Sequence, residues 1–306
     1  MNEGETGMAI NNIQTVLIIG SGTMGQQIGF QCAISGFDVN MYDISEAALE
    51  TALERMGKLS RHLIRSGQLT AEAAEAAFKR IRTFTDAQAA GEKADFVSES
   101  VPEDPKLKGR VFAQFNEICP PHAIFTTNTS SLVPSMFAEA TGRPDRFLAF
   151  HFHDTRVTKI VDIMPHPGTS PETVEAIRVF AGRIGQVPIM LKKENFGYVF
   201  NAMLMELFKA AQTLAANDVA SVEDIDRAWM GVMHTMTGPF GIMDSIGIDT
   251  VWKITDYWAK IVKNPQQIAN AAFMKPYVDR GDLGEKTGRG FYEYPHPAYG
   301  KPDFVA

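Results

Sequence analysis

The sequence has few of the features that mark secreted, membrane-spanning or nucleic-acid-binding proteins. Only two of its 306 residues are cysteines, Cys32 and Cys119, which is too few for a disulfide framework or a metal site. No apolar run approaches the ~20 residues of a membrane span, and the acidic, polar first residues carry no leader pattern. The net charge of −7 at pH 7 does not indicate the excess of basic side chains with which proteins bind the phosphates of nucleic acid. We therefore expect a cytoplasmic protein with no metal and with neither nucleic acid nor a membrane as partner.

The order of the predicted elements divides the chain into two parts. Hydrophobic residues make up 45% and charged residues 21% of the sequence, as in ordinary globular proteins. Strand and helix patterns alternate in the first part, which implies parallel βαβ units in a Rossmann-type doubly wound sheet, an α/β fold. Helical periodicity prevails from about Gly197 onward. We expect a nucleotide-binding domain over residues 1–192 and an all-α domain over residues 193–306.

The individual elements are predicted from periodicity and from capping residues. Ser45 is a suitable N-cap for a helix over 46–65 that Gly67 ends, and Thr70 one for a helix over 71–80. The other predicted helices cover 106–118, 172–184, 199–216, 222–230, 250–262 and 265–277. The predicted strands cover 16–19, 39–43, 94–99, 123–127, 147–151, 160–164 and 188–191.

A glycine turn between the first strand and the following helix predicts a dinucleotide site. Gly20 permits the tight turn, Gly22 lets the backbone approach a pyrophosphate, and Gly25 lets the helix pack against its strand. Asp43 ends the next strand, where a carboxylate can bind both ribose hydroxyls, and no Arg or Lys follows it to hold a 2′-phosphate. The predicted cofactor is therefore NAD, with Gly20, Gly22, Thr23, Met24, Gly25 and Asp43 as contacts. The alternative is a glycine turn without a ligand.

Two further segments carry polar side chains at the ends of predicted strands. Residues 126–131 form a hydroxyl- and amide-rich turn, which either faces a ligand or simply caps a helix. His151 and His153 share strand parity, so one face of that strand carries both. A histidine at the carboxyl end of a strand beside a nucleotide site is a candidate general base. The pattern does not choose between the two histidines.

Several segments match, in order, the motifs of one enzyme family. Its G-x-G-x-M-G, V-x-E-x-V-x-E, S/T-N-T-S-S, H-F-F-N-P, L/I-V-E/D and G-F/Y-V-x-N motifs are met by residues 20–25, 97–103, 127–131, 151–155, 160–162 and 197–201. Residues 238–244 and 284–292 are similar to two motifs of its C-terminal domain. Over nearly its whole length, the chain thus resembles the L-3-hydroxyacyl-CoA dehydrogenase family.

The resemblance implies a role for each matching residue. It makes His151 the general base, and it places Ser130 and Asn201 on the reacting oxygen. Asp162 stands where the family pairs this histidine with a glutamate, one methylene longer.

The resemblance also implies residues that bind the cofactor and the substrate. Glu103, Lys108 and Asn128 match positions at the nicotinamide end of the cofactor site, and Lys58 and Arg61 resemble contacts to CoA. The alternative for the charged members of this group is that they are solvated helix charges.

The chain departs from the family pattern beside the base. Asp154 and Thr155 replace Asn and Pro, and Ala202 stands where an Arg often follows the helix asparagine. Relatives of similar architecture oxidise free hydroxy acids such as gulonate or carnitine, and some are structural lens proteins. We expect NAD-dependent oxidation of an L-3-hydroxyacyl-CoA, short-chain, with a free 3-hydroxy acid as the alternative substrate and a non-catalytic NAD-binding protein as a third possibility.

The resemblance also implies a homodimer. Apolar stretches in the helical half, residues 203–214, 229–236 and 240–248, fit either an interface or the interior of that domain. The family resemblance favours the interface.

Overall fold

The structure, a computed structural model, describes residues 13–305. Contacts divide the chain into two compact units at the Val199–Phe200 boundary. The boundary expected from the sequence, between residues 192 and 193, lies earlier in the chain.

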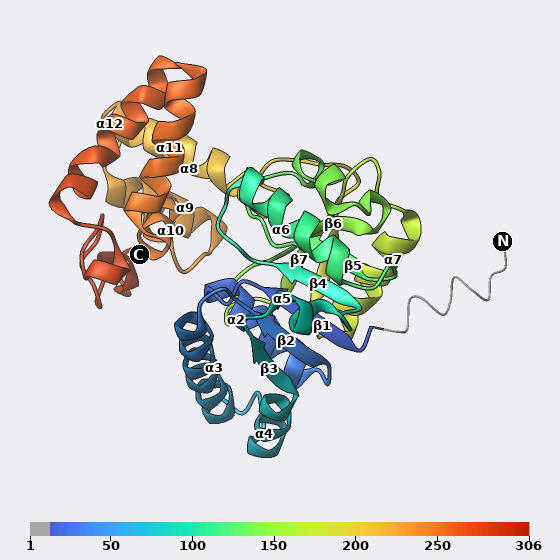
Figure 1. The fold of residues 1–306 in the computed structure, drawn as a ribbon. Helices are drawn as coiled ribbons and strands as arrows, with labels where there is room; N and C mark the ends of the chain where they lie inside the picture. The colour runs from blue at the N-terminus through green and yellow to red at the C-terminus, as the bar shows by residue number, and fades with distance from the viewer. Residues whose placement is uncertain (1–12, 306) are drawn as a thin grey trace. The chain divides into compact units, whose positions relative to one another are not determined.

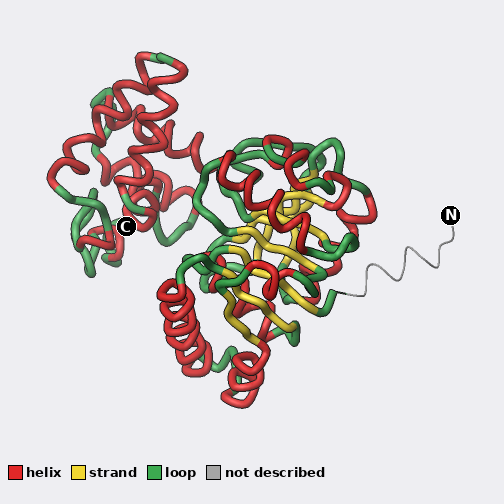
Figure 2. The backbone as a smooth tube through the Cα atoms, in the orientation of Figure 1, coloured by secondary structure: helices red, strands yellow, loops and turns green. Residues whose placement is uncertain are grey.

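The first unit is built on one eight-stranded sheet, drawn as arrows in Figure 1 and in yellow in Figure 2. Its strands lie in the order β3-β2-β1-β4-β5-β6-β7-β8. The chain builds the sheet outward from β1 to one side and then outward from β4 to the other, which confirms the Rossmann-type doubly wound fold. The strands are β1 (Thr15–Ile19), β2 (Asp38–Tyr42), β3 (Ile81–Phe84), β4 (Phe96–Glu99), β5 (Ile124–Thr127), β6 (Phe147–Phe152), β7 (Ile160–Pro165) and β8 (Val187–Met190).

Helices cover both faces of this sheet. They are α2 (Thr23–Ile34), α3 (Glu46–Arg65), α4 (Ala71–Arg80), α5 (Ala87–Gly91), α6 (Pro105–Ile118) and α7 (Pro171–Arg183). One apolar core joins α2, α3, α4 and α7 to the sheet, and a second core on the opposite face joins α5 and α6 to it. The predicted caps are confirmed, since the side chains of Ser45 and Thr70 accept hydrogen bonds from the backbone of α3 and α4.

The structure differs from the predicted elements in three places within this unit. The short strand β3 and the helix α5 were not predicted. β3 has two polar residues, Arg82 and Thr83, where the predicted strands have an apolar run, and the five residues of α5 are too few for helical periodicity to be recognised. The β6–β7 pair is antiparallel, whereas the sequence reading implied parallel βαβ units throughout. No crossover helix lies between these two strands, so they pair as neighbours joined by a loop, residues 153–159.

The second unit is helical, as expected. It contains α8 (Phe200–Ala216), α9 (Val222–Met233), α10 (Pro239–Ile246), α11 (Ile248–Val262) and α12 (Pro265–Arg280). Helix α10 was not predicted, because it is only eight residues long and begins at the proline of a glycine–proline pair, Gly238-Pro239, that is typical of a turn. The core of the second unit includes Phe208, Phe240 and Met274, each almost inaccessible to solvent. Among the described residues, no helix is long and apolar enough to cross a membrane.

Candidate active site

The turn between β1 and α2 has the backbone that its glycines predict. Gly20 has a φ of +95°, a region that favours glycine, and a Cβ there would lie 2.7 Å from the carbonyl oxygen of Ser100. A Cβ at Gly25 would lie 1.9 Å from the carbonyl oxygen of Gly20, so only glycine lets α2 approach its strand. A Cβ at Gly22 would meet nothing within 4 Å, which leaves open space beside the first turn of α2. No side chain caps that turn, so its N–H groups are available to an anion.

Asp43 is anchored at the end of β2 by the same turn. Its Oδ2 accepts hydrogen bonds from the N–H and the hydroxyl of Ser21 at 2.8 and 2.9 Å, and its Oδ1 accepts one from the N–H of Ser45 at 3.1 Å. The carboxylate is half-buried and keeps acceptor capacity on Oδ1. Ile44, which follows it, is 87% exposed and carries no positive charge. This arrangement fits a ribose with a free 2′-hydroxyl.

A buried ion pair lies behind the ends of β4 and β5. Lys108 and Glu99 are 1% and 0% exposed, and the Nζ of Lys108 lies 2.7 Å from Glu99 Oε1 and 3.2 Å from Glu103 Oε2. Glu99 also accepts a hydrogen bond from the hydroxyl of Thr127. Burial raises the pKa of Glu99 even though Lys108 opposes the shift. Glu103 and Lys108 were predicted from the sequence, but Glu99 was not, although it is the first glutamate of the V-x-E-x-V-x-E segment.

Glu103 organises the polar turn that follows β5. It accepts hydrogen bonds from the hydroxyls of Thr129 and Ser131 and from the N–H of Ser131. Burial would raise the pKa of Glu103, but these hydrogen bonds and the charge of Lys108 outweigh burial and lower it. The hydroxyl of Ser130 is exposed and makes no hydrogen bond within the described part of the chain.

Asn128 ties this turn to the strand that carries the histidines. Its N–H donates to the carbonyl of Glu99 at 2.9 Å, and its Oδ1 accepts from the N–H of Phe152 at 2.7 Å. Glu103, Lys108 and Asn128 thus hold the backbone around Ser130 and beside His151. These hydrogen bonds give Glu103, Lys108 and Asn128 a positioning role within the chain.

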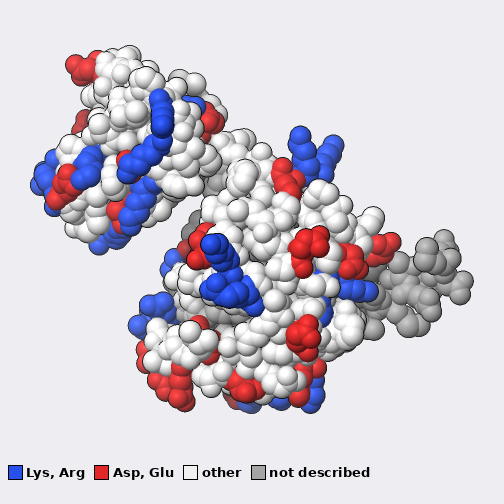
Figure 3. Space-filling view, turned by 45° about the horizontal axis from the view of Figure 1, so that its top comes forward, with Lys and Arg blue, Asp and Glu red and all other residues white. Residues whose placement is uncertain are grey.

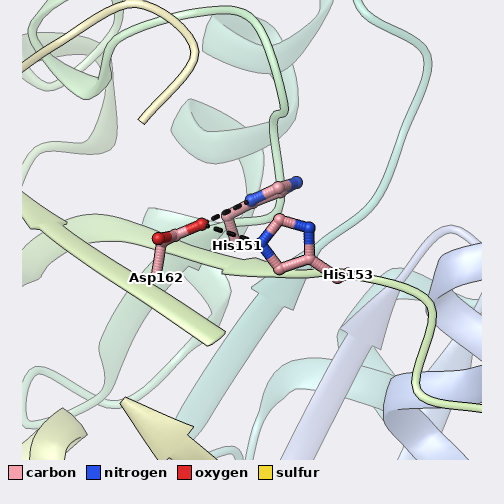
Figure 4. A group of neighbouring side chains, drawn as sticks. All are labelled: His151, His153 and Asp162. Carbon is pink, nitrogen blue, oxygen red and sulfur yellow. Dashed lines mark hydrogen bonds and ion pairs between the residues drawn. The ribbon is translucent and has the colours of Figure 1, made fainter. Parts of the chain in front are cut away.

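His151 and Asp162 face each other across the antiparallel β6–β7 pair (Figure 4). They are direct cross-strand partners, and His151 Nδ1 lies 3.1 Å from Asp162 Oδ2. Both residues are buried, at 5% and 1% exposed. Direct opposition explains why an aspartate reaches the ring although the family has a longer glutamate. The antiparallel pairing, which the sequence did not predict, is the cause of this contact.

His153 binds the same carboxylate oxygen. Its Nε2 also lies 3.1 Å from Asp162 Oδ2, and Figure 4 shows both imidazoles directed at that carboxylate. Burial would raise the pKa of Asp162, but the hydrogen bonds from the two histidines outweigh burial and lower it. Asp162 is therefore an anion at neutral pH that serves two imidazoles.

These three side chains are also of the types that bind metal ions. Their ligand atoms lie within 4.8 Å of one another. Both nitrogen–oxygen distances are normal for N–H···O hydrogen bonds. We interpret the group as a hydrogen-bonded cluster in which the Nδ1–H of His151 donates to the carboxylate of Asp162.

Tyr198 is a site residue that the sequence reading did not single out. Its ring is 2% exposed and stacks on His151, with centroids 4.7 Å apart and planes 24° apart. Its hydroxyl donates to the carbonyl of Thr129 at 2.6 Å, which links the base to the polar turn. The aromatic position of the G-F/Y-V-x-N motif was the available signal.

Three further predicted residues stand on other helices. Lys58 and Arg61 are exposed on α3, and in the described residues neither takes part in an ion pair. Asn201 belongs to the first turn of α8, in the second unit.

Together, the glycine turn, the anchored Asp43 and the His151–Asp162 pair define a nucleotide-dependent oxidoreductase of the Rossmann type. Two family models match the chain: the NAD-binding domain of 3-hydroxyacyl-CoA dehydrogenase over residues 15–195, and the C-terminal domain of the same enzyme over residues 197–294. The chain belongs to the 3-hydroxyacyl-CoA dehydrogenase family. It is an NAD-dependent oxidoreductase, which confirms the predicted cofactor.

Individual relatives agree with this assignment. A probable 3-hydroxyacyl-CoA dehydrogenase of Caenorhabditis elegans is 33% identical and covers 94% of this chain and 97% of its own length. The solved (S)-3-hydroxybutyryl-CoA dehydrogenase of Ralstonia eutropha is 32% identical with a TM-score of 0.83, and the match covers 92% of this chain and 99% of that one. A solved diketoreductase that acts on dicarbonyl compounds is 39% identical with a TM-score of 0.86 and the same coverage.

Proposed function

We propose that this protein oxidises short-chain L-3-hydroxyacyl-CoA esters to 3-oxoacyl-CoA, with NAD as the oxidant and His151 as the base. The observation that carries the proposal is the buried His151–Asp162 pair. Because Nδ1 of His151 faces the carboxylate of Asp162, the proton of the neutral imidazole is held on Nδ1. Nε2 therefore keeps its lone pair. Within the described residues Nε2 makes no hydrogen bond, so it is available to a substrate hydroxyl.

In the proposed mechanism His151 Nε2 takes the proton of the substrate hydroxyl. NAD, when bound, supplies the acceptor for the hydride that leaves C3 of the substrate. Asp162 stabilises the imidazolium that forms, and the stacked ring of Tyr198 holds the imidazole plane. Ser130 and Asn201 hydrogen-bond the reacting oxygen and position it.

The proposed NAD contacts follow from the geometry around the glycine turn. The first turn of α2, with Thr23 and Met24, binds the pyrophosphate, and Asp43 binds the ribose hydroxyls. The exposed side chain of Ile44 offers an apolar surface to the adenine. At the nicotinamide end we propose Glu103, Lys108 and Asn128, with the polar turn they hold as the contact surface.

A CoA ester needs local cations, because this protein is acidic overall. On the face shown in Figure 3, acidic and basic side chains are interspersed over the described chain. Lys58 and Arg61 lie one helical turn apart on α3 and are unpaired in the described residues, so both are available to phosphate groups. Relatives named for 3-hydroxybutyryl-CoA support a short acyl chain.

The alternative substrate is a free 3-hydroxy acid or a related dicarbonyl compound. The 39% identity to a diketoreductase supports it. So does the loop after the base: Thr155, which replaces the family's proline, donates through its N–H and hydroxyl to Gln27 Oε1, and a proline has no N–H to donate. The loop after His151 is therefore anchored to Gln27 by a backbone hydrogen bond that the proline of the family motif could not form.

A double variant separates the two substrate classes. We expect Lys58→Ala/Arg61→Ala to raise the KM for acetoacetyl-CoA about tenfold while leaving NAD binding and turnover of a free 3-oxo acid unchanged. The matched control is Lys79→Ala/Lys93→Ala, which removes two exposed cations that each pair with a glutamate. An equal KM for acetoacetyl-CoA in both double variants would show that Lys58 and Arg61 do not bind CoA. Wild-type turnover of the free acid with none of the CoA ester would replace the proposal by the alternative.

We also propose that the protein is a homodimer. Helix α11 carries an exposed apolar stripe at helical spacing, formed by Ile254, Tyr257, Trp258, Ile261 and Val262. Exposed apolar patches of this kind mark association surfaces. Light scattering should give twice the chain mass for wild type and for the control Lys253→Glu, and the single-chain mass for Trp258→Asp. A wild-type monomer would contradict the proposal.

A reducing, cytoplasmic location is proposed from the cysteines. Cys32 and Cys119 are buried free thiols, and burial raises the pKa of both, to about 12 in Cys119. Fluorescence of a tagged chain in the cytoplasm would agree with this location, and fluorescence confined to another compartment would contradict it.

A further inference from the structure

The carboxylate of Asp162 holds two imidazoles where a His–Asp pair needs one. His153 occupies the position at which the family signature has a second phenylalanine. Its Nε2 is 3.1 Å from Asp162 Oδ2, and its ring lies edge-on to that of His151, with centroids 4.7 Å apart. A phenyl ring at this position could not donate a hydrogen bond to Asp162. The three-membered cluster is therefore a feature of this chain's own sequence.

We propose that His153 is a positioning residue that shares Asp162 with His151 and lowers the pH at which the enzyme loses activity in acid. This inference rests on the proposed role of His151 as the base. It assigns His153 no contact with the substrate.

Both imidazoles use a single oxygen, Oδ2 of Asp162. A carboxylate oxygen that accepts two N–H groups stabilises each of them less than it would stabilise one alone. A second positive charge at this distance would also repel the imidazolium of His151. Both effects disfavour protonation of His151, so that the base stays neutral, and active, at lower pH than in a two-residue pair.

Other charged groups around the cluster do not account for this effect. Asp154, next to His153, forms an ion pair with Arg156. Tyr198 packs on His151, and burial raises the pKa of its phenol; the charges near Tyr198 are Glu99, Glu103, Asp162 and Glu194. Lys108 neutralises part of the charge of Glu99 and Glu103. All of these groups are the same in a His153 variant, so their contributions cancel in the comparison.

Two variants at position 153 test the proposal. His153→Phe removes the donor and the titratable group, whereas His153→Gln keeps a neutral N–H donor. We expect the acid limb of the kcat/KM profile to move up by about 0.5 to 1 pH unit in His153→Phe, since one hydrogen bond is worth about that much. In His153→Gln the shift should be less than half as large. A thermal unfolding curve and the Kd for NAD check that each variant is folded.

A second readout separates this inference from the proposed function. NMR titration follows the imidazole of His151 directly, in protein without substrate. If its pKa rises in His153→Phe and the rate profile follows, both ideas hold. If the pKa rises and the rate profile does not move, the shared carboxylate stands and His151 is not the base. If neither moves, or if Phe and Gln shift both equally, His153 does not act through Asp162 and the inference is wrong.

Discussion

Asp162 is the residue that fixes both histidines of the site, because its Oδ2 accepts both of their ring N–H groups. In Asp162→Asn the amide keeps the shape but cannot stabilise an imidazolium as an anion does. We expect turnover to fall by about 10²-fold or more, with NAD binding unchanged. The control is Asp145→Asn, at an exposed carboxylate of the same unit. Steady-state turnover near wild type in Asp162→Asn would show that the pair has no catalytic role.

Asp43 is the residue on which the choice of nucleotide depends. In Asp43→Ala we expect the KM for NAD to rise at least tenfold, because the ribose loses its acceptor, while kcat at saturating NAD changes little. Any preference for NAD over NADP should narrow, because the carboxylate no longer repels a 2′-phosphate.

Asp38→Ala is the matched control for Asp43→Ala, since Asp38 begins β2, the strand that Asp43 follows, and pairs with Arg80 at the surface. Wild-type protein that binds NADP as tightly as NAD in calorimetry would contradict this role of Asp43.

Among the elements, those with strong local signals were predicted, whereas the direction in which β6 and β7 pair was not. Helices α3 and α4 have apolar residues at helical spacing and a capping hydroxyl, so their bounds followed from the chain itself. The direction of β7 depends on which strand it meets, and local sequence does not encode that partner. Consequently the residues of the His151–Asp162 pair were predicted, by resemblance, but their direct opposition and the contact of His153 were not.

Buried carboxylates join the elements of the second unit. Asp226, on α9, is 0% exposed and accepts hydrogen bonds from the N–H groups of Phe240 and Gly241 and from the hydroxyl of Tyr292. We expect Asp226→Ala to lower the free energy of unfolding by about 3 kcal/mol or more, because three buried donors lose their acceptor.

Denaturant unfolding, monitored by circular dichroism, measures the effect of Asp226→Ala. The control Glu223→Ala changes an exposed carboxylate of the same helix and should cost about 0.5 kcal/mol or less. A similar loss in both variants would show that Asp226 does not hold α9 and α10 together.

For the whole molecule, the class of fold followed from the order of strand and helix patterns, and the structure confirms it. The glycine turn was predictable residue by residue, since its requirements are local: a positive φ at Gly20 and a close approach at Gly25. Tyr198 and Glu99 both stand in motifs of the family, but they were missed because their importance comes from contacts with other elements: Tyr198 packs on His151, and Glu99 accepts a hydrogen bond from Thr127. Long-range contacts of this kind become visible only when the fold is known.

In the proposed reaction, His151 takes the substrate proton while NAD oxidises a 3-hydroxyacyl-CoA. The most direct measurement is a single-turnover experiment that follows NADH formation with (S)-3-hydroxybutyryl-CoA and saturating NAD, in wild type and in His151→Gln. We predict rapid NADH formation in wild type and a rate lower by about 10²–10⁴-fold in His151→Gln, with unchanged NAD binding. The control His122→Gln, at an exposed histidine of the same unit, should match wild type. Equal rates in wild type and His151→Gln, or no NADH from wild type, would contradict the account.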